Sequence, residues 1–160
     1  MSNSVTISGV GDVRGVKQLS YVGHGVIKTR PKDELGVRLS YIFTKLSDVV
    51  AQYRPDIAAI EDIFVNAKNP RSTLKLGCAR GAALVALRIT IEGVEIKEFP
   101  PTIVKRYVSG YGLADKDLVA QRVKMILGKE CPAVSKDGAD ALAIAICGSC
   151  SCNNPLYKAA

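Results

Sequence analysis

The stretch that decides the fold reads Ser135-Lys136-Asp137-Gly138-Ala139-Asp140-Ala141-Leu142-Ala143-Ile144-Ala145-Ile146. Its alternation of alanine with large aliphatic residues predicts a buried helix, for which Ser135 is a suitable N-cap. Asp137 and Asp140 are three residues apart, so both carboxylates lie on one face of the first turn. The helix dipole favours acids there, but two on one face repel each other. The pair therefore predicts a bound cation, and oxygen ligands favour Mg²⁺, Mn²⁺ or Ca²⁺.

A third acid follows a short apolar run earlier in the chain. Residues 56–61 read Asp-Ile-Ala-Ala-Ile-Glu, which is typical of a strand buried between helices, and the run ends on Glu61. Ligands bind outside the carboxyl ends of strands in open α/β sheets, so we expect Glu61 to join Asp137 and Asp140. Metal chemistry here must rest on carboxylates, because the only histidine, His24, lies inside a strand-like run.

Strand and helix patterns alternate along the rest of the chain. Two N-terminal stretches have strand character, and we expect Gly9, Gly11 and Gly15 to interrupt the first. The predicted strands cover residues 5–7, 18–29, 56–61 and 94–99, and the predicted helices cover residues 31–53, 72–87, 103–108, 114–127 and 137–146. This order predicts an α/β fold, a mixed sheet flanked by helices, with one domain over residues 1–147. A disordered tail is expected over residues 148–160.

Small residues line the predicted helix over residues 72–87. Gly77, Ala79, Gly81, Ala82 and Ala83 lie close together in the sequence. We interpret this run as a face that packs closely against a sheet or a partner helix.

Composition indicates a basic globular protein. The 160 residues include 22 Lys and Arg against 15 Asp and Glu, which gives a formal net charge of +7. A basic surface favours a polyanionic partner, although many basic proteins bind none. Neither a membrane-spanning run nor a signal peptide is found, so we expect a cytoplasmic protein without membrane contact. Five cysteines without an export signal disfavour a disulfide framework, and the role of Cys147, Cys150 and Cys152 stays open.

Three blocks of sequence, taken in order, resemble the RuvC family of Holliday junction resolvases. They are residues 58–64 (AAIEDIF), 72–81 (STLKLGCARG) and 137–145 (DGADALAIA). The resemblance extends from about residue 18 to residue 146. It implies an RNase H-like fold, a homodimer, and Mg²⁺-dependent cleavage of two opposed strands of a four-way DNA junction in recombination and repair, with Mn²⁺ as a possible substitute. A branch-migration complex of the RuvA and RuvB type is the implied partner.

The resemblance also implies residue roles. Glu61, Asp137 and Asp140 match catalytic acids of the family, which would hold two metals about 4 Å apart to activate water and stabilise the leaving oxygen. Lys105 and Lys116 match basic residues near the scissile phosphate, where negative charge develops.

Two further residues are expected to contact DNA. Phe64 matches an aromatic residue that wedges into the junction centre, and the alternative is a core or interface phenylalanine. Arg80, in the second block, is the other expected DNA contact.

One family motif has no counterpart. The family carries a fourth acid in an I-D-P-G segment on its first strand, whereas residues 6–12 resemble the region after that strand. The sequence therefore predicts a truncated or degenerate first strand. Asp12 is the nearby acid, and its position suits a turn better than a metal ligand. The leading hypothesis is an active resolvase, and the alternative is a catalytically impaired or inactive junction-binding protein. A nucleotide phosphotransferase of the same fold is disfavoured, because no Gly-rich phosphate loop is present.

Overall fold

The computed structural model describes residues 4–13, 16–62 and 70–151. Their contacts divide the chain into two compact units, and each is described by itself below. In chain order the elements are β1 (Ser4–Val13), β2 (Val16–Lys28), α1 (Leu35–Tyr53), β3 (Ile57–Glu61), α2 (Pro70–Thr90), β4 (Glu95–Phe99), α3 (Pro101–Ser109), α4 (Lys116–Leu127), a 3₁₀ turn (Gly128–Glu130) and α5 (Lys136–Ser151).

The strands pair as two ladders, β1 with β2 and β3 with β4. The second ladder is parallel, because the Glu95 N–H at the start of β4 donates to the Asp56 carbonyl just before β3, at 3.0 Å. The prediction that Gly9 and Gly11 interrupt the first strand is wrong, since β1 continues through both, and Gly15 lies outside the described residues. Asp12 accordingly lies in a strand and not in a turn. Glycine weakens an isolated strand, but the ladder with β2 supports it.

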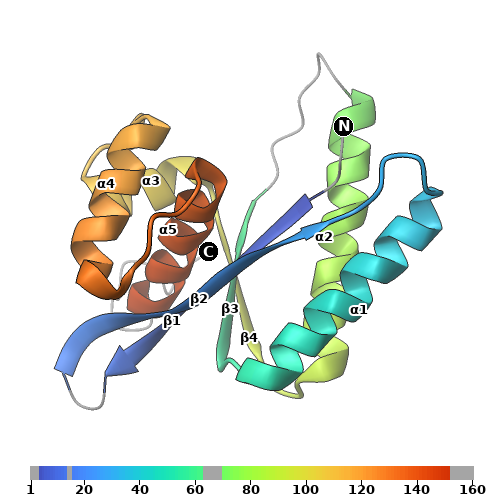
Figure 1. Cartoon of the computed structure of the whole chain (residues 1–160), viewed down its shortest axis with the longest axis horizontal. Helices are drawn as coiled ribbons and strands as arrows, with labels where there is room; N and C mark the ends of the chain where they lie inside the picture. The colour runs from blue at the N-terminus through green and yellow to red at the C-terminus, as the bar shows by residue number, and fades with distance from the viewer. Residues whose placement is uncertain (1–3, 14–15, 63–69, 152–160) are drawn as a thin grey trace. The chain divides into compact units, whose positions relative to one another are not determined.

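The first unit contains the residues Met1–Val5, Val26–Ala58 and Asp62–Ile96, and its helices α1 and α2 lie side by side (Figure 1). Helix α1 buries Ile42, Leu46 and Val50, which recur every four residues. It ends at Arg54, whose φ of 44° is left-handed. Pro55 follows, and proline disfavours helical geometry in the residue before it.

The small residues of α2 only partly meet the packing expectation. Ala79 is buried, but a Cβ added at Gly77 or Gly81 would meet no atom within 4 Å. Instead of close packing at these glycines, the first unit has an open groove of about 350 Å³ between α1 and α2. The groove is lined by Leu39, Ser40, Phe43, Thr44, Cys78, Gly81, Ala82 and Val85.

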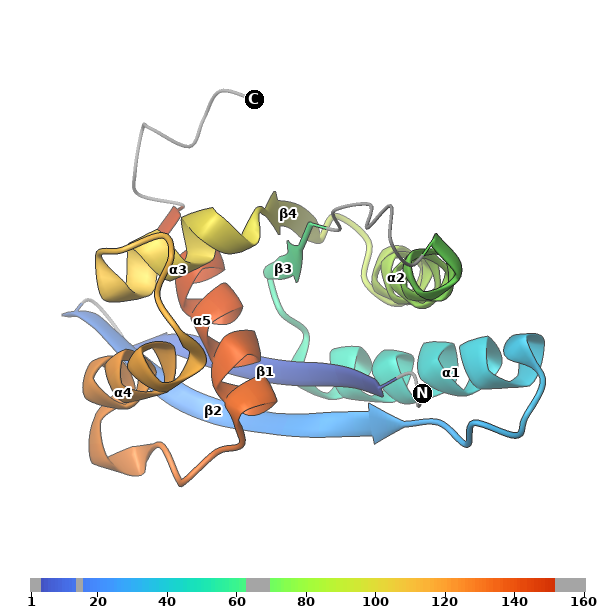
Figure 2. The same ribbon diagram turned by 90° about the horizontal axis from the view of Figure 1, so that it is seen from above.

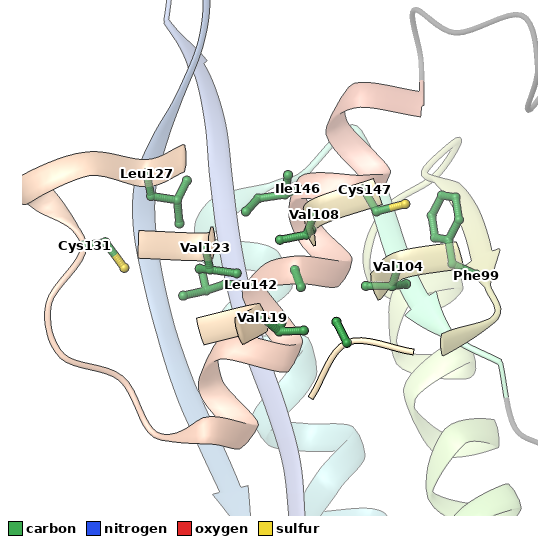
Figure 3. Close-up of a cluster of buried hydrophobic side chains, with 12 residues drawn as sticks. Phe99, Val104, Val108, Val119, Val123, Leu127, Cys131, Leu142, Ile146 and Cys147 are labelled. Atoms are coloured by element: carbon green, nitrogen blue, oxygen red, sulfur yellow. The ribbon is translucent and has the colours of Figure 1, made fainter. Parts of the chain in front are cut away.

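The second unit contains the residues Thr6–Gly25, Ala59–Glu61 and Lys97–Ala160, and Figure 2 shows its helices α3, α4 and α5 grouped together. Its core is apolar: Leu142 and Ile146 of α5 are fully buried with Val119 and Val123 of α4 (Figure 3). The predicted N-cap of α5 is confirmed, because Ser135 Oγ accepts a hydrogen bond from the Gly138 N–H at 3.1 Å. The alanine-rich helix that follows Ser135 is thus the central helix of this core.

Helix α5 extends beyond the predicted boundary. It runs to Ser151, so the expectation of a disordered tail from residue 148 is wrong for the first four residues, and residues 152–160 lie outside the described part. Cys147, just before these four residues, is fully buried. Burial, and to a smaller extent the neighbouring Cys150, raises the pKa of its thiol to about 11. Cys78, Cys131, Cys147 and Cys150 are free thiols, and Cys152 lies outside the described residues.

Among the described helices, none has both the length and the apolar character that crossing a membrane requires.

Candidate active site

Both acids at the start of α5 are paired with one lysine of α4. Lys116 Nζ lies 3.0 Å from Asp137 Oδ1 and 2.9 Å from Asp140 Oδ2. Lys116 is the first residue of α4, whose start is fixed by the N-cap Asp115: its Oδ1 accepts a hydrogen bond from the Leu118 N–H at 2.8 Å. Hydrogen bonds to Asp140 and then Asp137 raise the pKa of Lys116. The ammonium group thus partly neutralises the carboxylates for which the sequence predicts a cation.

Glu61 and Asp140 line one recess of the second unit, with a volume of about 290 Å³. The end of β3 supplies Glu61 and the first turn of α5 supplies Asp140, while Lys105 of α3 and Lys116 of α4 are the other charged residues of the lining. The rest of the lining is apolar and consists of Pro101, Val104, Val119, Ala143 and Ile144. The recess therefore places two carboxylates and two ammonium groups around a small space with apolar walls.

The surroundings of Glu61 disfavour the charged form of its carboxylate. The pKa of Glu61 is raised, first because the surrounding protein removes part of its water and second because the Asp140 carboxylate repels its negative charge. Lys116 and then Lys105 act in the opposite direction. A desolvated carboxylate beside a second one is stabilised in its charged form by a nearby cation.

Asp137 occupies a different position from the other two acids. Its side chain is 74% exposed and is not part of the recess lining, although Lys116 joins it to Asp140. Across residues 4–13, 16–62 and 70–151, no three His, Cys, Asp or Glu side chains are grouped closely enough to hold a metal ion. The donor chemistry of Glu61 and Asp140 nevertheless fits a hard divalent cation, since both line the recess and supply carboxylate oxygens. Asp137 and Asp140 are both paired with Lys116, so a cation would compete with this ammonium group for either carboxylate.

The residues expected to contact DNA have three different placements. Lys105 and Lys116 lie with the acids in the recess. Arg80 is half-buried on α2 and belongs to the first unit. Phe64 lies outside the described residues. Sequence reasoning missed the pairing of Lys116 with both acids, because contacts between residues more than 20 positions apart depend on how α4 packs on α5 and leave no local signal.

Acids at a strand end and a helix start, accompanied by two lysines, are typical of a nuclease of RNase H-like fold, and comparison with known proteins gives this class. A solved structure of Thermus thermophilus RuvC has a TM-score of 0.71 at 32% identity, and covers 89% of this chain and 92% of that one. T. thermophilus RuvC in complex with Holliday junction substrate has a TM-score of 0.74 at 32% identity, and covers 88% of this chain and 90% of that one.

Sequence comparison gives the family. The model of the family "Crossover junction endodeoxyribonuclease RuvC" matches residues 3–148. The crossover junction endodeoxyribonuclease RuvC of Rickettsia bellii is 44% identical over 128 residues, 80% of each chain. The protein of the same name from Citrifermentans bemidjiense is 44% identical over 143 residues, 88% of this chain and 84% of that relative. The chain belongs to the RuvC family, and the prediction made from the three sequence blocks is confirmed.

Proposed function

We propose that this protein is a structure-specific DNA endonuclease that resolves four-way junctions in recombination and repair by metal-dependent hydrolysis of phosphodiester bonds. The observation that carries the proposal is the recess in which Glu61 and Asp140 lie with Lys105 and Lys116, in a chain of the RuvC family. The junction complex of the T. thermophilus relative supports junction DNA as the substrate. The family match over residues 3–148 supports one resolvase domain.

The proposal assigns the acids to the metal. Glu61 and Asp140 would hold it, with Asp137 joining after release from Lys116, and Mg²⁺ is the proposed ion because every donor is a carboxylate oxygen; Mn²⁺ is an acceptable substitute. When bound, the ion supplies Lewis acidity and lowers the pKa of an attacking water.

The remaining roles concern phosphate and DNA. Lys105 and Lys116 would stabilise the charge that develops on the phosphate oxygens, since ammonium groups in a partly desolvated site act strongly on such charge. Phe64 is proposed as the junction wedge and Arg80 as a contact to the DNA. The net charge of +7 supports a salt-sensitive affinity for the backbone of the junction.

The experiment that tests the proposal is cleavage of a synthetic four-way junction. We expect nicks at symmetric positions in two opposed strands when Mg²⁺ is added, none after chelation, and none in a linear duplex of the same sequence. Denaturing gels of junctions labelled on each strand in turn measure this. Junction binding without nicks in either Mg²⁺ or Mn²⁺ would instead support the inactive junction-binding alternative, which the missing I-D-P-G acid motivates.

A homodimer is part of the proposal, because two opposed strands require two active sites. A stripe of small and apolar residues along α2 supports it. The stripe consists of residues 74, 78, 81, 82, 85 and 89, and its middle four line the groove against α1. Leu74 and Ile89, at the ends of the stripe, are each 70% exposed. A complex of the RuvA and RuvB type is the proposed partner that delivers the junction.

Val85→Glu is expected to weaken the dimer tenfold or more, since it would bury an unpaired charge in an apolar interface. Val85 lies inside the stripe and is 49% exposed in the single chain. Sedimentation equilibrium measures the dissociation constant, and Met125→Glu on α4, at a residue that is 71% exposed, is the control. A wild-type mass of one chain at micromolar concentration would contradict the dimer, and an unchanged Val85→Glu dimer would contradict the use of this stripe.

A further inference from the structure

Gly148 allows a close contact between α5 and β3 inside the second unit. A Cβ built at Gly148 would lie 2.6 Å from the Cβ of Ala59 and 3.8 Å from its Cα. Nonbonded carbon atoms prefer a separation of about 3.5–4.0 Å. The Ala59 Cβ is fixed to the backbone and cannot rotate away. The contact therefore exists only because residue 148 has no side chain.

The contact between Gly148 and Ala59 lies on the same side of α5 and of β3 as the acids of the recess. Residues 140, 144 and 148 recur every four positions and form one stripe along α5, and Ile144 lines the recess beside Asp140. In β3, residues 59 and 61 point to the same face, because side chains alternate along a strand. Gly148 thus meets Ala59 on the same helix stripe and strand face that carry Asp140 and Glu61.

Little room is left for α5 to adjust at this point. Phe99 Cε2 lies 3.9 Å from the added Cβ, on the next strand of the same ladder. Three residues that precede Gly148 on α5 are fully buried in the core: Leu142, Ile146 and Cys147. Because protein interiors are close-packed, a side chain at residue 148 would displace the helix from β3 and not be absorbed locally.

We propose that Gly148 is a positioning residue for the reaction: the absence of its side chain fixes how closely α5 approaches β3, and this approach sets the spacing of Asp140 and Glu61. The proposal rests on the proposed function of these two acids. A glycine kept only for packing would affect stability and leave the acids unchanged. A positioning glycine also changes what the acids bind.

The test compares Gly148→Ala with the double variant Ala59→Gly/Gly148→Ala, in which the carbon that the new Cβ would meet is removed. For Gly148→Ala we expect Mn²⁺ to bind the DNA-free protein about tenfold more weakly, measured by electron paramagnetic resonance. We expect the cleavage rate at saturating junction to fall about 100-fold, since a misplacement of about 1 Å has effects of this size. Junction affinity should stay within about threefold. The double variant should recover Mn²⁺ affinity and rate to within about threefold, and Ala59→Gly alone controls for a glycine in the strand.

The results for these variants distinguish a positioning role of Gly148 from a role in packing alone. A Gly148→Ala protein with a lower melting temperature but unchanged Mn²⁺ affinity and rate overturns the positioning role. If that variant does not fold, the double variant decides: near-normal Mn²⁺ affinity supports the role, and a loss overturns it.

A metal-independent readout separates this proposal from the proposed function. The backbone amide resonances of Glu61 and Asp140 should shift in Gly148→Ala and return in the double variant. If the wild-type protein neither binds Mn²⁺ nor nicks junctions, the proposed function fails, while these resonances still support or overturn the positioning role.

Discussion

Asp140→Asn is expected to reduce junction cleavage by on the order of 10³-fold or more, because a metal ion supplies several kcal/mol of charge stabilisation and each ~1.4 kcal/mol is a factor of ten. Asparagine has the shape of aspartate, so the packing of α5 is kept. The substitution removes the carboxylate that raises the pKa of Glu61 and that pairs with Lys116 at 2.9 Å. Single-turnover cleavage of a labelled junction measures the rate, and gel retardation measures binding, which should change by less than about threefold.

The matched control is Asp117→Asn. Asp117 also lies in the first turn of a helix and pairs with a lysine, since Lys136 Nζ is 2.7 Å from its Oδ1. Its side chain is 71% exposed and is not part of the recess, so we expect unchanged cleavage. Normal nicking by Asp140→Asn would remove the recess from the reaction, whereas equal losses in both variants would indicate a nonspecific effect of charge.

Lys116→Met is expected to lower cleavage about 100-fold without weakening Mn²⁺ binding. Removing one preorganised donor to a developing oxyanion has an effect of about 10²–10³ on rate. Metal affinity should hold or rise, because the ammonium group lies within 3.0 Å of both Asp137 and Asp140 and competes with a cation for them. Methionine keeps the apolar stem. Single-turnover rates at saturating Mg²⁺, together with Mn²⁺ titration of the DNA-free protein, measure the two effects.

Lys136→Met is the matched control for this variant. Lys136 lies next to Asp137, has a similar exposure (59% against 51% for Lys116) and pairs with Asp117. We expect its loss to leave both measurements unchanged, because exposed ion pairs contribute little. Weaker Mn²⁺ binding in Lys116→Met would contradict competition and indicate that the lysine holds the acids in place.

The sequence predicts the helices of this protein well where local physics sets them. Ser135 as the N-cap of α5 depends on residues within four positions, and the end of α1 at Arg54 depends on the proline that follows. The existence of β1 is predicted correctly but its extent is not, because Gly9 and Gly11 weaken a strand locally while pairing with β2 supports it. The end of α5 was placed too early, since Gly148 is a helix breaker by propensity but packs on Ala59.

The sequence predicts which residues belong to the candidate site better than it predicts how their side chains are arranged. Glu61 ends β3, as the sequence predicts, and lines the recess with Asp140, although the strand is half-buried and not fully buried. Nothing in the sequence indicates that Lys116 joins Asp137, which lies outside the recess, to Asp140, which lines it, because this depends on the packing of α4 against α5. Motifs identify the family through residue types, whereas distances between their side chains depend on the whole core.

The contacts of Lys116 have an electrostatic consequence for the first encounter with DNA. Glu61, Asp137 and Asp140 carry three negative charges when ionised, and Lys105 and Lys116 carry two positive charges, so these five groups sum to −1 and not −3. Repulsion of an approaching phosphate scales with this local charge. The protein thus has an internal counter-ion, and we expect it to weaken the repulsion between these carboxylates and an approaching polyanion.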